Sequence, residues 1–227
     1  MKNILVIAPH ADDEILGCGA TIAKHIRNND TVYVAIMTNA SKGAPELFSR
    51  QDVESIRQEA RNAHSLLGIK DTFFYDFPAP KLEQFPQYKI SNEISTLIKE
   101  LNIDMLYIPH KGDLHMDHGA IYNASLVASR PFADQSVSKI LAYETLSETE
   151  WGHPTVENTF IPTFFNKLKD SDLKAKKLAM ECFASQLRPF PHPRSIEAIE
   201  HLAALRGATV GSYSAEAFVI VRETHAE

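Results

Sequence analysis

The stretch Ile4-Leu5-Val6-Ile7-Ala8-Pro9-His10-Ala11-Asp12-Asp13-Glu14 decides the fold of this chain and locates its chemistry. Residues 3–8 are apolar without alternation, which is typical of a strand that is buried on both faces. One imidazole and three carboxylates follow this strand within five residues. From Glu14 to about Arg27 apolar residues recur with helical spacing. The stretch therefore predicts a strand–loop–helix unit that carries polar groups at the carboxyl end of its strand.

The rest of the sequence continues the alternation of strand and helix to about residue 130, which predicts βαβ units and a mostly parallel sheet. Up to that point we expect strands at 32–37, 73–75 and 105–108, and helices at 49–67 and 94–101. Beyond it we expect a strand at 139–143, an irregular segment at 145–169, helices at 171–184 and 195–206, and a closing strand at 217–221. The prediction is one α/β domain over residues 1–227, Rossmann-like, with helices on both faces of the sheet and a C-terminal elaboration.

Composition excludes several classes of function. The chain has 227 residues and a net charge of -6, with 23 basic residues, which argues against a nucleic-acid partner. Its two cysteines, Cys18 and Cys182, lie far apart inside helical patterns, as buried thiols of a reduced protein would. No apolar run approaches the length of a membrane span, and the first one is too short for a signal peptide. We expect a cytoplasmic protein without a membrane partner.

A second polar cluster, Asp113-Leu114-His115-Met116-Asp117-His118, follows the predicted strand at 105–108. In open α/β sheets ligands bind beyond the carboxyl ends of the strands, so the two clusters are expected to meet. Two imidazoles and one carboxylate, from His10, Asp13 and His118, leave one or two coordination positions open, as catalytic zinc requires.

Other side chains of the two clusters have candidate roles beside the metal. Asp12 precedes the ligand Asp13 and points differently in an extended loop, which makes it the candidate general base. His115 lies three residues before His118, where it can donate to a developing oxyanion or protonate a leaving amine. Asp113 and Asp117 are expected to orient ligands rather than to bind the metal themselves.

The paired motifs resemble those of the PIG-L/LmbE-like N-acetylglucosaminyl deacetylase family, whose signature is a His-Pro-Asp-Asp-Glu loop followed by a His-x-Asp-His loop. This chain has Ala11 and Met116 where the two motifs usually have proline, a backbone stiffener that supplies no ligand. The resemblance extends to further segments of the chain, namely 16–22, 57–68, Tyr143-Glu144, Ser185-Gln186, His192-Pro193-Arg194-Ser195 and 215–218.

Carried over to these positions, the resemblance implies zinc ligation by His10, Asp13 and His118. It further implies Asp12 as the general base and His115 as the electrophilic partner of the tetrahedral intermediate. Arg57 is implied as a substrate-anchoring cation, with pairing to a carboxylate on the helix surface as the structural alternative. His192 and Arg194 lie in a proline-rich loop that is expected to reach the pocket from the C-terminal elaboration, with ordinary loop packing as the alternative. The implied substrate is an N-acetylated sugar conjugate, and the bacterial relatives suggest a homo-oligomer.

Three other interpretations were considered. A dinucleotide-binding site at Gly17-x-Gly19 is disfavoured, because these glycines lie too far from the first strand for that fingerprint. Two histidines and one carboxylate also suit ferrous iron, so a mononuclear iron enzyme is an alternative, although an α/β pattern is unusual for it. A sugar-binding module without turnover is the non-enzymatic alternative, and it needs neither Asp12 nor His115. Segments 39–50 and 145–169 are expected to decide which sugar conjugate binds.

Overall fold

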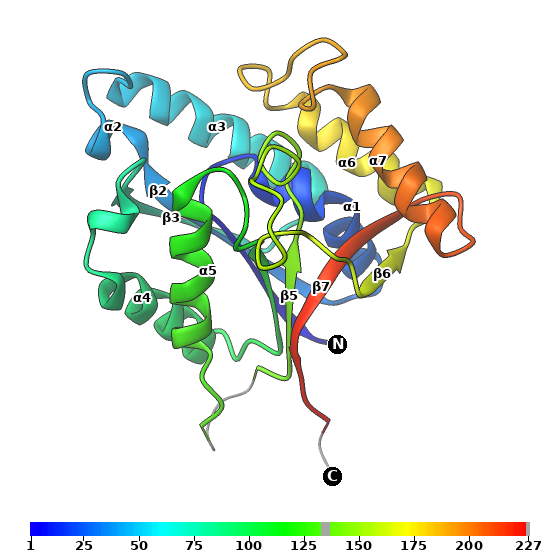
Figure 1. Cartoon of the computed structure of the whole chain (residues 1–227), viewed down its shortest axis with the longest axis horizontal. Coiled ribbons are helices and arrows are strands. Elements are labelled where there is room, and N and C mark those ends of the chain that lie inside the picture. Colours follow the sequence, from blue (N-terminus) through cyan, green and yellow to red (C-terminus); the bar gives the residue numbers. More distant parts are fainter. Residues whose placement is uncertain (133–136, 226–227) are drawn as a thin grey trace.

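The computed structural model describes residues 1–132 and 137–225, which form a single seven-stranded mixed sheet with helices on both faces (Figure 1). The strands lie in the order β3-β2-β1-β4-β5-β7-β6, and β1 to β5 are mutually parallel. The strands are β1 (Asn3–Ala8), β2 (Thr31–Asn39), β3 (Asp71–Pro78), β4 (Met105–Pro109), β5 (Lys139–Tyr143), β6 (Phe164–Lys167) and β7 (Ala215–Glu223). The predicted α/β architecture with a mostly parallel sheet is therefore confirmed.

The helices form two layers, each covering one apolar face of the sheet. On one side α1, α3, α6 and α7 pack over Val6, Val34 and Tyr107, and on the other α4 and α5 pack over Leu5, Ala35 and Leu106. Side chains alternate between the faces along each strand, and because both faces are covered the central strand β1 is apolar on both faces from Ile4 to Ala8. The helices are α1 (Asp13–Arg27), α2 (Ala40–Gly43), α3 (Arg50–Leu67), the 3-10 turn η1 (Leu82–Gln84), α4 (Gln87–Glu100), α5 (Met116–Ala128), α6 (Asp170–Glu181) and α7 (Ile196–Thr209).

Local signals set several of the helix ends. The Ser49 hydroxyl accepts a hydrogen bond from the Asp52 backbone and the Asp52 carboxylate accepts one from the Ser49 backbone, a capping box that begins α3. Gly68 ends the same helix with φ 85°, the left-handed conformation that glycine adopts without strain.

One expectation was wrong. Residues 145–169 were expected to be irregular, yet they contain β6, which pairs with β7 in antiparallel fashion from Phe164↔Phe218 to Lys167↔Ala215. The strand has four residues and lies at the edge of the sheet, where one neighbour is enough to hold it, so it has neither the length nor the apolar continuity of a central strand.

The C-terminal elaboration is fastened to α1 through buried polar groups. The Glu216 carboxylate accepts hydrogen bonds from the backbone N–H groups of Ala20 (3.1 Å) and Thr21 (2.6 Å). Lys176 of α6 pairs with Glu216 at 2.6 Å and donates to the Leu16 carbonyl at 2.6 Å. Charges that are paired and fully hydrogen-bonded are tolerated inside a fold. Two residues from the second half of the chain, Lys176 and Glu216, therefore hold α1, the helix that follows the first polar loop.

Candidate metal centre and active site

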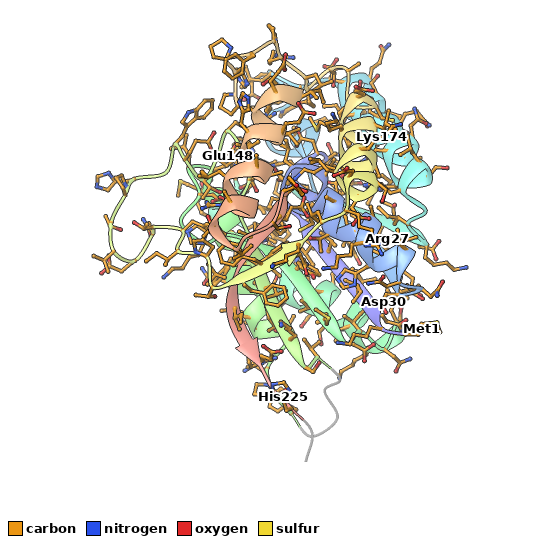
Figure 2. All side chains as sticks on the ribbon, turned by 90° about the vertical axis from the view of Figure 1, so that its right-hand side faces the viewer. Met1, Arg27, Asp30, Glu148, Lys174 and His225 are labelled. Carbon is orange, nitrogen blue, oxygen red and sulfur yellow. The ribbon has the colours of Figure 1, made fainter. Side chains whose placement is uncertain are left out.

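The two polar clusters meet where the strand order reverses. The chain leaves β1 toward β2 on one side and enters β4 on the other, so the loops after β1 and β4 diverge and leave a crevice at their carboxyl ends. His10 follows β1, and His115 is the N-cap residue of α5, which follows β4. Figure 2 places Glu148, which follows β5, at the end of the molecule opposite His225, which follows the antiparallel β7. The carboxyl edge of the parallel strands therefore carries the polar groups.

Three ligand atoms converge as the spacing predicted. One ligand atom from each of His10, Asp13 and His118 lies within 4.8 Å of the other two. Asp13 Oδ2 is 3.3 Å from His10 Nδ1 and 3.2 Å from His118 Nε2. Within the described part of the chain, the buried His118 Nε2 has no hydrogen-bond partner. An unpaired buried imidazole nitrogen that faces a carboxylate is a ligand atom in position for a cation, so the donor set fits zinc or ferrous iron.

The His118 ring is held from its other side. Asp113 Oδ2 lies 2.8 Å from His118 Nδ1, and Thr149 donates its hydroxyl proton to Asp113 Oδ1 at 2.6 Å. This carboxylate fixes the proton on Nδ1 and leaves Nε2 as the ligand atom. The predicted orienting role of Asp113 is thus the one that its contacts favour.

Asp117 links the two loops and belongs to a second possible ligand group, together with His10 and His115. Its Oδ2 is 3.2 Å from His10 Nε2, and its Oδ1 accepts a hydrogen bond from the Leu82 backbone at 3.1 Å. The backbone N–H of Asp117 donates to His115 Nδ1 at 3.2 Å. That bond leaves the proton of a neutral His115 on Nε2, where it is a donor.

Asp12 lies beside this group in a strained backbone conformation. Its φ of 112° is in the left-handed region, which a non-glycine residue rarely adopts without support. The Asp12 N–H donates to Glu14 Oε2 at 3.1 Å, and the other Glu14 oxygen is 2.8 Å from His64 Nε2. Glu14 therefore connects the Asp12 backbone to His64 of α3.

Arg194 is brought to the same place from the C-terminal elaboration. Its Nη1 lies 3.3 Å from Asp12 Oδ2, and its Nη2 lies 3.6 Å from Glu148 Oε1. Hydrogen bonds to the Ser147 hydroxyl (2.7 Å) and to Gln186 Oε1 (3.0 Å) fix the guanidinium group.

Burial and neighbouring charges shift the pKa values in this cluster. Burial raises the pKa of Asp12 to about 8, although Arg194 opposes the shift. For His10 burial alone lowers the pKa, but hydrogen bonds with Asp117 and Asp13 outweigh it and raise the value to about 9. Burial and the charge of His10 lower the pKa of His115 to about 4. A dication bound by His10, Asp13 and His118 would disfavour protonation of the groups around it. It would keep the His10 and His118 imidazoles neutral and lower the pKa of Asp12.

A cavity of about 480 Å³ opens above this group, and its lining includes His10, Asp12, His115, Arg57 and Arg194. Of the predicted substrate-binding residues, Arg57 lines the wall while its Nη2 donates to the Tyr75 carbonyl and to Asp76 Oδ1. His192 is not among the described lining residues, and its ring packs edge-on against Trp151 at 5.9 Å.

Sequence reasoning gave no site role to four polar lining residues, Thr38, Asp52, Glu148 and Gln186. Glu148 accepts a hydrogen bond from the His115 backbone at 3.2 Å, and burial raises the pKa of its carboxyl group. It lies in a segment without regular periodicity, so nothing local distinguishes it from a surface carboxylate. Gln186 had a weak signal, since Ser185-Gln186 was one of the segments of the resemblance.

The crevice combines a His–Asp–His group that could hold a metal ion with the adjacent buried carboxyl group of Asp12, an arrangement that fits a hydrolase. Residues 5–129, more than half of the chain, match the family model described as GlcNAc-PI de-N-acetylase (PIG-L). The chain belongs to this family, as the motifs predicted.

Named relatives agree with this assignment. The uncharacterized deacetylase YaiS of Escherichia coli is 30% identical over 185 residues, covering 79% of this chain and 89% of YaiS. A probable N-acetyl-alpha-D-glucosaminyl L-malate deacetylase 2 of Bacillus cereus is 28% identical, covering 74% of this chain and 80% of the relative. The solved N,N'-diacetylchitobiose deacetylase of Pyrococcus horikoshii has a TM-score of 0.76 at 20% identity, covering 97% and 84% of the two chains. In the described residues, none of the helices combines the length and the apolarity that a bilayer span requires.

Proposed function

We propose that the protein removes the N-acetyl group from an N-acetylglucosamine-type sugar conjugate, with a zinc ion held by His10, Asp13 and His118. The observation that carries this proposal is the convergence of one atom from each of these three residues beside a cavity that His10, Asp12 and His115 line. Membership of a family described by de-N-acetylation, and relatives named as deacetylases, support the reaction and the sugar.

The chain's own groups supply the proton transfers. A zinc ion in this donor set would lower the pKa of a coordinated water and polarise the acetyl carbonyl. The Asp12 carboxyl group is buried and lines the cavity, with its Oδ2 3.3 Å from Arg194 Nη1, and it is placed to accept the proton of the attacking water. Arg194 holds the Asp12 carboxyl group against the cavity.

His115 stabilises the developing negative charge. Because its Nδ1 accepts the Asp117 backbone N–H, its Nε2–H is available as a donor in the cavity lining. The proton taken by Asp12 is the one that the departing amine requires, so the same carboxyl group can return it. A binding module needs none of these proton-transfer groups, and their presence favours turnover.

The test is acetate release by protein stripped with a chelator and then loaded with zinc or with ferrous iron. Methyl α- and β-glycosides of N-acetylglucosamine are the substrates. We expect release only from metal-loaded protein, with glucosamine methyl glycoside as the product, and release at least about 100-fold slower from the D12N variant. Binding of the glycosides by metal-loaded protein without any acetate release would refute the enzyme and leave the binding module.

A further inference from the structure

One wall of the cavity is apolar and exposed. Leu47 and Phe48, in the connection between α2 and α3, are 73% and 41% exposed and line the cavity. Val53 and Ile56 continue the same surface along the first turns of α3. Leaving adjoining large apolar side chains in water is costly, and an exposed apolar surface at a cavity marks a binding site. We call these four residues the apolar wall.

The cations of the lining are already engaged. No lysine is among the described lining residues, and the guanidinium groups there are those of Arg57 and Arg194. Arg57 donates to the Tyr75 carbonyl at 2.6 Å and to the Asp76 carboxylate at 2.7 Å. Arg194 lies against the Asp12 carboxylate. Each guanidinium group thus lies beside a carboxylate that offsets its charge toward an acidic group of a ligand, although Nε of Arg57 has no hydrogen-bond partner in the described residues.

The remaining charges of the lining disfavour an anion as well. Asp52 begins α3 beside Val53, and Glu148 lies on the polar side of the cavity with Gln186. A carboxylate on the ligand would face these like charges in a partly desolvated space. The two sides of the cavity therefore differ in chemistry: Glu148 and Gln186 suit sugar hydroxyl groups, and the apolar wall suits a part of the substrate that carries none.

The cavity is also larger than the sugar's acetyl group requires. About 480 Å³ lies within the 300–1,000 Å³ typical of sites that enclose whole small molecules. The cavity therefore has room for the sugar ring and for a further part of the substrate beyond the reacting amide.

We propose that the substrate is an N-acetylglucosaminide whose aglycone is neutral and apolar, and that this aglycone lies against Leu47, Phe48, Val53 and Ile56. The inference rests on the proposed function and names its substrate class. It sets this chain apart from the relative named for L-malate, a dianionic aglycone.

Binding of the product-type amines tests the wall without requiring turnover. Methyl, butyl and hexyl glucosaminides are titrated calorimetrically into zinc-loaded protein, with 5-carboxypentyl glucosaminide as the charged counterpart of the hexyl compound. We expect the Kd to fall about twofold to fourfold for each added methylene. We expect the carboxypentyl compound to bind at least about tenfold more weakly than the hexyl compound, because it faces like charges.

Variants tie the effect to the wall. In L47S/F48S the Kd values of the methyl and hexyl glucosaminides should converge, since both substitutions remove exposed apolar surface and leave the core intact. The matched control is L205S/F132S, because Leu205 and Phe132 are 60% and 62% exposed and lie outside the cavity lining. The control should retain the full dependence on chain length. Equal Kd values for the methyl and hexyl compounds in the unaltered protein, or a dependence that persists in L47S/F48S, would overturn the proposal.

Acetate release from the N-acetylated forms of the same glycosides separates the two proposals. Binding that improves with chain length without acetate release would refute the deacetylase and keep the assignment of the wall. Acetate release with no preference for long aglycones would support the deacetylase and refute the assignment of the apolar wall to the aglycone. Faster hydrolysis of N-hexanoyl than of N-acetyl methyl glucosaminide would place an acyl chain on the wall and would overturn the aglycone assignment.

Discussion

Replacing Asp113 by Asn is expected to weaken zinc binding about tenfold. The Asp113 carboxylate lies 2.8 Å from His118 Nδ1 and receives the Thr149 hydroxyl proton at 2.6 Å on its other oxygen. An asparagine can keep both contacts, because its amide oxygen accepts from Nδ1–H and the Thr149 hydroxyl can turn to accept from the amide. What it loses is the charge.

The size of the loss follows from that difference. A hydrogen bond to a charged group contributes roughly 1.5–3 kcal/mol and a neutral one roughly 0.5–1.5 kcal/mol. A difference of about 1.4 kcal/mol is tenfold in Kd. The D113A variant also frees the His118 ring to rotate, so its Kd should rise about 100-fold.

Competition with a chromophoric zinc chelator measures the Kd of each variant, and circular dichroism checks that each is folded. The control is D104N, because Asp104 accepts a backbone hydrogen bond from Asn3 at 2.7 Å at the opposite edge of the sheet. If D113N and D113A both bind zinc within twofold of the unaltered protein, His118 is not a ligand oriented by Asp113, and the ligand set is wrong.

Three further predictions concern catalysis and stability. D12N should lower the rate of acetate release by about 10²–10⁴-fold while zinc content, measured by atomic absorption, stays the same; loss of the metal instead would make Asp12 a ligand. K176M should lower the free energy of unfolding in urea by about 3–5 kcal/mol, because it leaves the buried Glu216 carboxylate without its cation; a loss below about 1 kcal/mol would show that water compensates the charge. Burial alone raises the pKa of Asp172, but hydrogen bonds from Arg27 and a backbone N–H hold it below its ordinary value. A carboxyl group whose pKa is lower in the folded state stabilises the fold above its unfolded pKa of about 4, and this stabilisation is lost as the pH falls below that value. D172N should therefore be less stable than the unaltered protein at pH 7 and equally stable near pH 2. An equal loss of unfolding free energy at both pH values would show that the ionisation of Asp172 does not stabilise the fold.

The elements that the sequence predicted well are those whose signal is local. The strand before His10 is apolar and buried from Ile4 to Ala8, and Gly68 occupies the left-handed position at which α3 ends. The meeting of the two polar clusters was also predictable, because parallel strands deliver their carboxyl ends to one edge.

The rest depends on contacts between distant segments. Glu148 has no distinguishing neighbours in the sequence and gains its position only because the segment after β5 folds back over His115. The link from Asp117 to His10 spans 107 residues and could not be read from spacing. Leu47 and Phe48 lie in segment 39–50, which was expected to decide which sugar conjugate binds, but nothing in its pattern showed that these two side chains are exposed at the cavity.

The attachment of α1 to the C-terminal elaboration bears on how this chain can be divided. The family model ends at residue 129, which invites a view of the second half as an accessory. Glu216, however, accepts hydrogen bonds from backbone N–H groups in the middle of α1, and Arg194 faces the carboxyl group of Asp12. A chain truncated after residue 129 would keep His10, Asp13 and His118 and still lack the groups that hold the loop after β1 and the helix α1. Chimeras between relatives should therefore exchange α1 together with the segments that carry Lys176, Arg194 and Glu216, as one unit that is scattered in sequence and contiguous in space.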